Sequence, residues 1–590
     1  MVIVQMCFQN RSFAKNLILS FSCFLFTNSF NKGSVSMKRI RQGCCDFYRR
    51  LVRLLFGFVA LWLFVSSLVF TSYLPYNEIS WICSDYTVLL CLLFAVLCLA
   101  LLQYWKIPFL QKGQQGRPLR IARWGMILCA GALAIWWVGF ARLLPLTDAK
   151  WTRESALGLL QGYSYWFENG SYMSIYPHQS GLALYQYLLL SVFGQDNVIC
   201  FQYINCFAYM VILWAMGEFS YLFGLKDRGC LAVTILGILF YPLMFYVTFV
   251  YGTLQGLALS MTGLLLAIRF CEKGGWHRAV FSALALSLAV MIKANYEIFV
   301  VGVLLYLVYS GLMKQNKGVL LPIFLLLVGF LAATRVPIRI MEQLSGCTLN
   351  NGYPTSTWLV MGLTDGVESS PGWWSSYAND TYAQSGQNAV IQNQIALEDL
   401  KVILSGYLHN PLSFVRFLVL KNATQWCEPL FQGLWLNNVM MLCNETPMPQ
   451  WAQEFLSTSN QFYLAQGLSV LQSLIYGGLV LWAWVPSPET RKDSEDLLAV
   501  ILLGGFVFHC FWEAKGQYTM PYYVLVFPLA KLGYARLRLH SADSIRESCK
   551  PLSGKLRWLM PLFALLAALL MAFAMRGPLK ETLEMYKNIM

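Results

Sequence analysis

The chain of 590 residues is 57% hydrophobic and 12% charged, and its mean hydropathy is +0.53. A soluble globular protein carries about 25% charged and about 45–50% apolar residues, so this composition indicates a protein that is solvated mainly by lipid. The net charge of +14 does not indicate nucleic-acid binding, because the Lys and Arg residues lie in short loops between apolar stretches, where they set membrane topology. The 17 Cys residues lie mostly inside those apolar stretches, and their spacing gives no zinc motif.

The N-terminal segment 1–36 contains an apolar run that is too short to cross a bilayer, and no small-residue cleavage site follows it. From Met37 the sequence MKRIRQGCCDFYRRLVR is a basic start that leads into an apolar span. We therefore expect a functional chain that begins at Met37, with segment 1–36 a mis-annotated or dispensable extension. A genuine interfacial segment is the alternative.

Long apolar stretches recur along the rest of the chain. Because a membrane-spanning helix needs about 20 predominantly apolar residues, these stretches predict an all-α polytopic membrane protein with about 13 transmembrane helices. The expected spans lie near residues 52–73, 86–104, 121–143, 198–223, 230–250, 254–271, 278–294, 297–313, 318–337, 462–484, 497–512, 520–535 and 557–575.

The basic loops between these spans predict the topology. All of them face the cytoplasm only if the short apolar stretch 181–193 does not cross the membrane, so we expect that stretch to be an interfacial helix. Segments 144–197 and 338–461 then lie outside, and loops as long as the second are usually functional. Within it, IALEDLKVILSGYL and PLSFVRFLVLKNATQW have the apolar spacing of interfacial helices.

The first outer segment begins with LPLTDAKWTRESALGLLQG, which places Asp148 at the mouth of an apolar span and Glu154 six positions later. Asp148 is either a reacting carboxylate or the cap of a helix that starts at Ala149. The later stretch YSYWFENGSYMSIYPHQSG contains Tyr176, His178 and Gln179, which are either surface residues or members of a site.

Two further polar interruptions are expected on the same side of the membrane. They are MIKANYEIFV, with Lys293 and Asn295, and FHCFWEAKGQYTMPYYVLVFPLA, with Glu513, Lys515, Gln517 and Tyr518. Ionisable groups at membrane depth are costly and indicate a functional site by default. The alternatives without a function are a lysine whose side chain reaches to the membrane surface at the first stretch and a Glu–Lys ion pair that closes a turn at the second.

The long outer loop contains the stretch TDGVESSPGWWSSYANDTY, with adjacent Trp373 and Trp374. Aromatic faces stack on the C–H surfaces of sugars, while neighbouring amides and hydroxyls bind sugar hydroxyl groups. Anchoring in the membrane interface accounts equally well for such aromatic residues.

Taken together, these stretches resemble the GT-C glycosyltransferases, in particular the bacterial branch similar to protein O-mannosyltransferases and lipid A aminoarabinose transferases. The resemblance is carried by LPLTDAKWTRESALGLLQG, YPHQSGLALYQYLLLSVFG, IKANYEIFV and EAKGQYTMPYYVLVFPLA. It covers the chain from about residue 120 onward, so residues 37–120 hold two additional spans, 121–337 the membrane core and 462–590 the C-terminal spans.

The resemblance implies transfer of a sugar from a polyprenyl-phosphate carrier to a glycan, lipid or protein acceptor on the outer face. It implies Asp148 as the general base and Lys293 or Lys515 as ligands of the carrier phosphate. Glu154 and His178, in the same outer segment, are further catalytic candidates from the sequence itself. Many relatives have two adjacent acids in the first loop, where this chain has Asp148 alone, and many have Arg where it has Gln517. A divalent ion, Mg²⁺ or Mn²⁺, stays open as a cofactor.

Two other classes of protein share this composition. A transporter or flippase of lipid-linked sugars would move its substrate unchanged, and an assembly protein would have no chemistry. Transporters tend to show internal repeats and broken helices near the midplane, whereas this chain has no evident repeat and places its polar groups on one face. We expect an enzyme of the bacterial plasma membrane with its active site outside.

Overall fold

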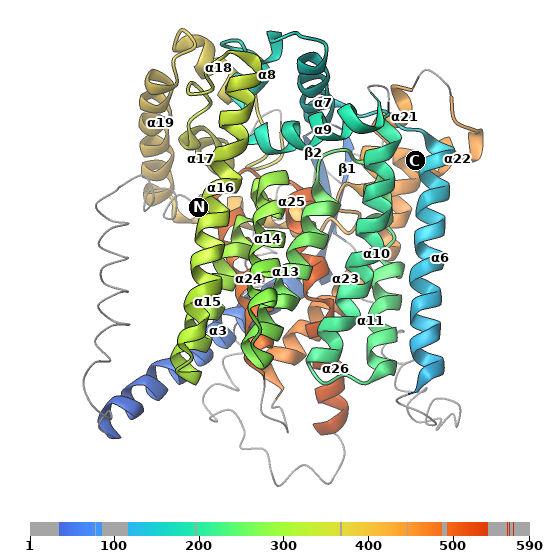
Figure 1. Cartoon of the computed structure of the whole chain (residues 1–590), viewed down its shortest axis with the longest axis vertical. Coiled ribbons are helices and arrows are strands. Elements are labelled where there is room, and N and C mark those ends of the chain that lie inside the picture. The colour runs from blue at the N-terminus through green and yellow to red at the C-terminus, as the bar shows by residue number, and fades with distance from the viewer. Residues whose placement is uncertain are drawn as a thin grey trace.

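The computed structural model describes residues 35–76, 78–84, 116–194, 197–365, 369–444, 447–485 and 492–540, with the isolated residues 563, 566 and 570. The expected span at 86–104, nearly all of the extension 1–36 and most of the span at 557–575 lie outside the described residues. Most of the described chain is helical, and its long helices run side by side as a bundle (Figure 1).

Long apolar helices form the body of this bundle. By length and composition, eight helices in the described part can cross a membrane, or up to ten if two bent helix pairs each count as one span. This agrees with a multi-pass membrane protein, with fewer spans described than the 13 expected. The eight are α3 (Val35–Val69), α6 (Arg117–Ala141), α10 (Val198–Leu222), α13 (Thr253–Lys273), α15 (Glu297–Lys314), α16 (Leu320–Ser345), α23 (Thr458–Trp484) and α24 (Asp493–Phe511).

Three expected spans are shorter or broken. The expected span 230–250 is α11 (Asp227–Leu239) followed, at a bend of 60°, by α12 (Pro242–Phe245) and η4 (Tyr246–Thr248). The expected span 278–294 is α14 (Trp276–Ile292), and the span 520–535 is divided into α25 (Gly516–Leu525) and α26 (Phe527–His540). Proline favours such breaks because it disfavours helical backbone at the preceding residue, and Pro242 begins α12.

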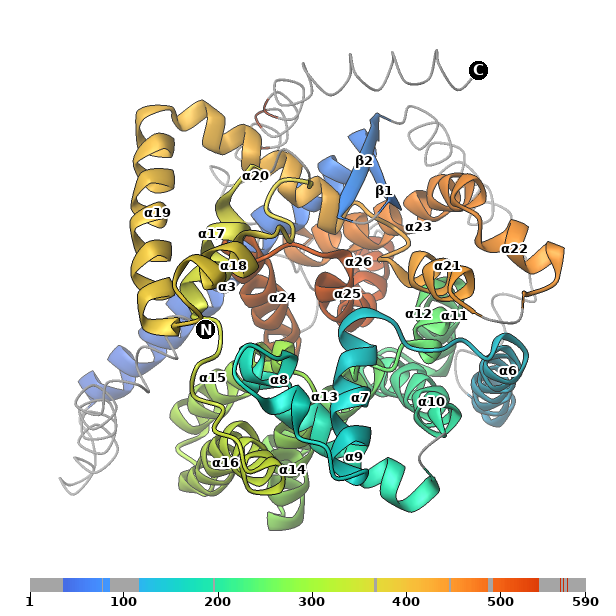
Figure 2. The same cartoon turned by 90° about the horizontal axis from the view of Figure 1, so that it is seen from above.

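The prediction that the first span continues to residue 73 is wrong, because α3 ends at Val69 and a β-hairpin follows. Strands β1 (Phe70–Tyr76) and β2 (Ile79–Ser84) pair antiparallel. Their sequences, FTSYLPY and ISWICS, are rich in aromatic and β-branched residues, which fit a pleated surface. The Ser72 amide donates to the Cys427 carbonyl at 2.8 Å, and the hairpin lies beside α20 (Pro411–Trp426) and α23 (Figure 2).

One end of the bundle carries a layer of short helices, which we call the polar end. Its first part contains α7 (Thr147–Leu160), η2 (Tyr165–Phe167), α8 (Tyr172–Ile175), η3 (Pro177–Gln179) and α9 (Ser180–Phe193) (Figure 1). Helix α9 has 14 residues, too few for a span, as expected for 181–193. It packs closely on α14, because a Cβ at Gly181 would lie 1.9 Å from the Met291 carbonyl oxygen.

The second part of this layer follows α16. It contains α17 (Thr355–Leu363), α18 (Tyr377–Gln384), α19 (Ala389–His409), α20, α21 (Gly433–Leu442) and α22 (Gln450–Leu456). Helix α19 exposes apolar residues, as an interfacial helix would. The expectation of a second interfacial helix holds for only half of α20, because its C-terminal part, including Lys421 and Trp426, is buried in the protein.

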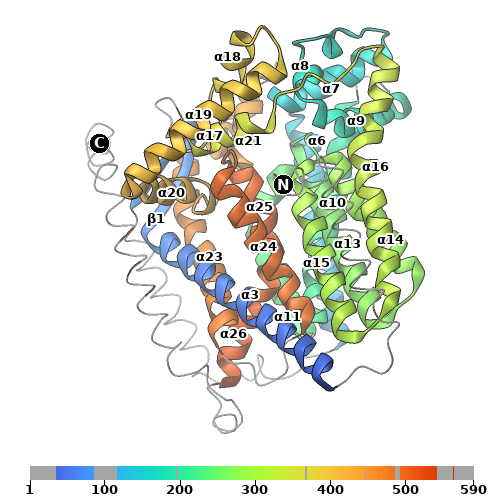
Figure 3. The ribbon, with the colours of Figure 1, turned by 90° about the vertical axis from the view of Figure 1, so that its left-hand side faces the viewer.

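Ion pairs hold the helices together at the opposite end of the bundle. Glu218, near the C-terminus of α10, pairs with Arg123 of α6 and Arg269 of α13. Helix α3 crosses the bundle obliquely beside α23 and α24 (Figure 3), and buried Arg536 of α26 pairs with Glu495 of α24. These ion pairs join α10 to α6 and α13, and α24 to α26, at the end of the bundle opposite α7.

Two native cysteines test the predicted topology. Cys443 is exposed beyond α21 at the polar end, and Cys44 is exposed near the start of α3 at the opposite end. We expect a membrane-impermeant maleimide to label Cys443 in intact cells and Cys44 only after permeabilisation. Loss of labelling in the Cys443→Ser and Cys44→Ser chains identifies each labelled site. Labelling of Cys44 in intact cells would show that the start of α3 faces outside and would contradict the predicted topology.

Candidate functional site

Asp148 lies in the first turn of α7, at the polar end of the bundle, and its side chain is exposed. The helix begins at Thr147 rather than at Ala149, and no side chain caps it. Asp148 therefore does not act as the N-cap, although a carboxylate in a first turn still benefits from the helix dipole. Thr147 has a φ of 49°, a left-handed conformation that is strained for a β-branched residue and typical of functional sites.

Tyr251 connects Asp148 to the neighbouring segments. Its hydroxyl donates to Asp148 Oδ2 at 3.4 Å and accepts a hydrogen bond from Gln179 Nε2 at 2.5 Å. On the other side of Asp148, its backbone carbonyl accepts hydrogen bonds from the hydroxyls of Thr152 and Tyr172. The orientation of the Asp148 turn is therefore set by three segments: α7, α8–η3 and the loop before α13.

Gly252 allows Tyr251 to approach the end of α14. Its φ is +74°, and a Cβ at this position would lie 2.3 Å from Ile292 Cγ2. No side chain other than hydrogen fits both the backbone conformation and this contact. Gly252 therefore places Tyr251 and Thr253 against Lys293, the residue that follows α14.

Lys293 is a buried cation, 9% exposed, in the extended break between α14 and η5 (Ala294–Tyr296). Its ammonium donates to Thr253 Oγ1 at 2.9 Å and lies 4.2 Å from the centroid of the Tyr251 ring. Within the described part of the chain it forms no ion pair. Burial lowers the pKa of Lys293 to about 7, while the charge of Asp148 acts in the opposite direction.

A second group of charges comes from the other side of the bundle. Lys515 Nζ lies 2.8 Å from Glu78 Oε1 and 3.5 Å from Glu513 Oε1. Burial raises the pKa of Glu513 to about 7. Burial alone would lower the pKa of Lys515, but the adjacent carboxylates raise it above the ordinary lysine value. Lys515 is thus held as a cation by two carboxylates, and the expected Glu–Lys pair has a third member.

Tyr518 of α25 lies between the two groups. Its ring centroid is 5.9 Å from Lys293 Nζ. Burial raises the pKa of Tyr518, and the charges of Glu513, Asp148 and Glu78 raise it further. These contacts join one set of residues, which we call the polar cluster: Asp148, Tyr251, Lys293, Glu78, Glu513, Lys515 and Tyr518.

Several residues expected in the site lie at the margin of this cluster. Glu154 pairs with Arg153 at 2.9 Å and has no contact with Asp148 among its recorded partners. Tyr176 and exposed His178 belong to an aromatic group, because the His178 ring lies 6.0 Å from Tyr176 and 5.9 Å from Trp358. Of the three catalytic candidates Asp148, Glu154 and His178, only Asp148 therefore lies in the polar cluster.

Asn295 and Gln517 are held through their backbones. The Asn295 carbonyl accepts a hydrogen bond from Tyr522 at 3.3 Å, and the Gln517 amide donates to Gln432 Oε1 at 3.1 Å. The side-chain oxygen of Gln517 is buried without a hydrogen-bond partner in the described chain. Gln517 Oε1 is therefore an acceptor without a donor in the described chain, whereas the recorded contact of Asn295 is through its main chain.

The expectation that Trp373 stacks on a sugar is wrong. Its side chain is 1% exposed, packs with Leu74 and Ala514, and donates from Nε1 to Thr424 Oγ1 at 2.9 Å. A ring that is fully enclosed offers no face to a substrate. Trp374 is partly buried in a separate aromatic group with Tyr353 and its neighbours.

Sequence reasoning missed Glu78, Tyr251 and Thr253. Glu78 lies in the short connection between the expected spans 52–73 and 86–104, and nothing in its local sequence indicated that it would pair with Lys515. Tyr251 and Thr253 flank the glycine in VYGT at the end of an apolar run. That glycine, at a span boundary, is the one sequence signal that marks a tight turn here.

The residues of the polar cluster do not fit a divalent metal. No group of three or more His, Cys, Asp or Glu side chains in the described chain is arranged to hold an ion. Mg²⁺ and Mn²⁺ favour carboxylate and carbonyl oxygens, but Glu78 and Glu513 both face the ammonium of Lys515. In the described chain, the carboxylates of the cluster beside Lys515 are therefore occupied by an ammonium and do not form a site for such an ion.

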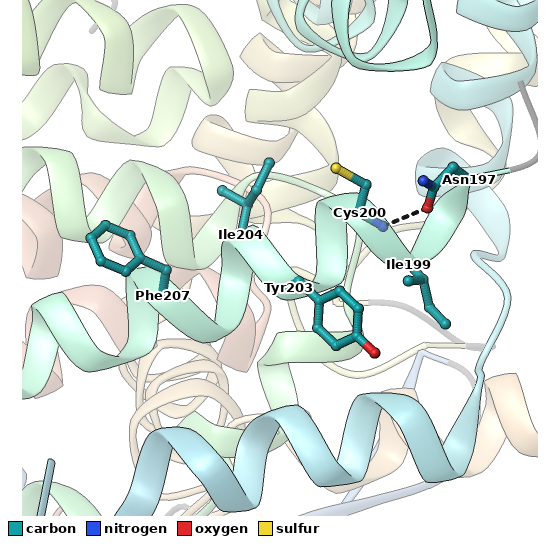
Figure 4. A pocket seen from close by; sticks show the side chains of 6 residues that line it. All are labelled: Asn197, Ile199, Cys200, Tyr203, Ile204 and Phe207. Carbon is teal, nitrogen blue, oxygen red and sulfur yellow. Dashed lines mark hydrogen bonds between the residues drawn. The ribbon is translucent and has the colours of Figure 1, made fainter. Parts of the chain in front are cut away.

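A hollow of about 450 Å³ lies on another part of the surface. It is lined by residues of α10 and by Asn197, which precedes that helix (Figure 4). Gln202 and Asn205 of the same helix turn inward to the carbonyls of the 247–249 segment. The apolar hollow therefore lies on the face of α10 that points away from the bundle interior. Gln202 and Asn205 lie on the opposite face, which contacts the segment before Tyr251.

Comparison of the chain with protein-family models, with curated proteins and with solved structures gives no match. The likeness to GT-C glycosyltransferases rests on the sequence stretches alone. The polar cluster is consequently the main physical ground for a function.

The close approach at Gly252 gives a stability prediction. We expect Gly252→Ala to destabilise the protein by about 1–3 kcal/mol more than Gly162→Ala, because both glycines have positive φ but only Gly252 meets a neighbouring side chain. Thermal unfolding of the purified chains in the same detergent measures the difference. Equal unfolding temperatures of the Gly252→Ala and Gly162→Ala chains would show that the end of α14 can shift to accept a Cβ at Gly252 without loss of stability.

Proposed function

We propose that the chain is a membrane glycosyltransferase, which transfers a sugar from a polyprenyl-phosphate-linked donor to an acceptor at the polar end. One observation carries this proposal: the exposed Asp148 carboxylate and the buried Lys293 ammonium, which forms no ion pair in the described chain, contact the same tyrosine, Tyr251. Transfer from a lipid phosphate needs a base for the acceptor and a cation for the leaving phosphate. These two groups supply both, at one end of a bundle of apolar helices.

In the proposed reaction, the acceptor hydroxyl or amine loses its proton to the Asp148 carboxylate as it attacks the anomeric carbon of the donor. A bond forms between the acceptor atom and that carbon. The bond from the carbon to the phosphate oxygen breaks, and its electron pair leaves with the phosphate. The Lys293 ammonium stabilises the charge that develops on that oxygen, in a setting where little water competes.

Lys293 is better suited than Lys515 to hold the phosphate. A cation whose charge is already balanced by Glu78 gains little from a further anion. In the described chain, by contrast, the Lys293 ammonium contacts a hydroxyl and aromatic rings and forms no ion pair. Lysine is a common point-charge ligand of phosphate. We therefore assign the phosphate to Lys293 and treat Lys515 as part of the surrounding frame.

Replacement of Asp148 tests the base. We expect Asp148→Asn to lower the rate of sugar transfer by about 10²–10⁴-fold, because the amide keeps the shape but cannot accept the proton. Donor binding and unfolding temperature should stay near those of the unmodified chain. The measurement is transfer of radiolabelled sugar from polyprenyl-phosphate donors by the purified protein in nanodiscs.

Glu154→Gln is the matched control, because Glu154 is a carboxylate on the same helix that pairs with Arg153 outside the polar cluster. Its transfer rate should be nearly unchanged. Near-normal turnover by Asp148→Asn would contradict the assignment of the base. Movement of the lipid without loss of its sugar would instead support a transporter.

The pKa of Lys293 gives a pH prediction. A phosphodiester donor keeps one negative charge from pH 6 to pH 8, while Lys293 loses its proton as the pH rises through about 7. Because the interaction exists below that pKa and is lost above it, we expect donor affinity to fall about tenfold from pH 6 to pH 8.

Lys293→Arg separates this effect from other titrations, because arginine stays protonated throughout the range. Donor affinity of the Lys293→Arg chain should depend on pH much less steeply, with the remaining dependence due to Glu513, whose pKa is also about 7. Equilibrium binding of a fluorescent polyprenyl phosphosugar at several pH values measures both chains. An equally steep pH dependence in the arginine chain would remove Lys293 from the phosphate site.

A further inference from the structure

Glu78 reaches the polar cluster from the tip of the β1–β2 hairpin, and several contacts fix it there. The Ser370 amide donates to the Glu78 carbonyl at 2.9 Å, and the Ser80 amide donates to Ser370 Oγ at 2.8 Å. Leu74 of the same hairpin packs with Ala514, which lies between Glu513 and Lys515 in the sequence. Glu78 itself has a left-handed φ of 58°. The hairpin thus holds this carboxylate firmly rather than leaving it free at the surface.

The charges around Lys515 are not balanced. Its single ammonium faces Glu78 at 2.8 Å and Glu513 at 3.5 Å. The second carboxylate oxygen of Glu78, Oε2, is buried and has no hydrogen-bond donor in the described chain. Glu78 alone balances the charge of the Lys515 ammonium, and the ionised fraction of Glu513, whose pKa burial raises to about 7, adds further negative charge on this side of the polar cluster. Lys293 provides the one cation of the cluster that no carboxylate pairs in the described chain.

We propose that Glu78 determines specificity by restricting the donor site to lipids that carry a single phosphate. This inference rests on the proposed function, and it names which class of polyprenyl donor the site accepts. One phosphate group fits the Lys293 ammonium. The additional phosphate of a lipid diphosphate would need a second cation, and the nearest other ammonium in the cluster, that of Lys515, faces two carboxylates.

Repulsion of like charges provides the selectivity. A phosphate that approached Lys515 would come close to Glu78 Oε2 and Glu513, and juxtaposed like charges at a binding site cost enough to exclude a partner. Specificity of this kind arises from what the site rejects rather than from additional contacts to the accepted ligand. Loss of the Glu78 charge would release Lys515 to bind a second phosphate.

The experiment compares undecaprenyl phosphate and undecaprenyl diphosphate as probes, so that the identity of the sugar does not matter. Dissociation constants for both lipids are measured with the full chain in nanodiscs at pH 7. We expect the unmodified chain to prefer the monophosphate. Glu78→Gln should reduce that preference by about tenfold or more, through tighter binding of the diphosphate.

Two further chains make the result specific. Glu154→Gln removes a carboxylate outside the polar cluster and should leave the ratio of the two dissociation constants unchanged. Glu78→Met, which removes the charge with a side chain of similar length, carries the test if Glu78→Gln does not purify as a folded protein. A shifted ratio in either Glu78 chain, with the Glu154 control unchanged, supports the inference.

The outcomes distinguish this inference from the proposed function. If the unmodified chain binds neither lipid, the polyprenyl-phosphate function itself fails. If it binds the monophosphate but the ratio does not change on removal of the Glu78 charge, Glu78 does not determine specificity and the function stands. Equal affinity of the unmodified chain for both lipids also overturns the inference.

Discussion

The buried ammonium of Lys293 is the constraint around which the polar cluster is organised. A charge removed from water is costly unless it is paired or hydrogen-bonded. Lys293 has one hydroxyl partner and aromatic faces, and no ion-pair partner in the described chain. Cation–π contacts compensate only part of that cost. The site is therefore electrostatically incomplete in a way that an anionic ligand would correct.

The fold supplies this arrangement from segments that are far apart in the sequence. The break between α14 and α15 presents the lysine, and the tight turn at Gly252 brings the Tyr251 ring over it. The first turn of α7 adds Asp148, and the hairpin after α3 adds Glu78. The long apolar helices carry none of these groups in their interior turns. These helices form the rigid body of the protein, and the segments that connect their ends carry the residues of the polar cluster.

Sequence reasoning succeeded where a signal was local. Apolar length indicated the bundle, and ionisable residues at the ends of spans pointed to Asp148, Lys293 and Lys515, because such groups are rare at membrane depth. It failed where the answer depended on distant partners. Glu78 and Lys515 are separated by 437 positions, and no local pattern in β1 or β2 indicates that pairing. Trp373 looked like a binding residue because enclosure by a distant helix cannot be read from its neighbours.

In the proposed site, the Lys293 ammonium holds the phosphate of a polyprenyl lipid. Solid-state NMR on ¹⁵N-lysine-labelled protein with bound undecaprenyl phosphate tests this contact directly, through dipolar coupling between lysine nitrogen and phosphorus. A charge-assisted hydrogen bond to the phosphate places the two nuclei within about 4 Å. We predict strong coupling from one lysine, lost in the Lys293→Arg chain, which lacks that labelled nitrogen. Coupling that persists in this chain, or none in the unmodified protein with lipid bound, would contradict the claim.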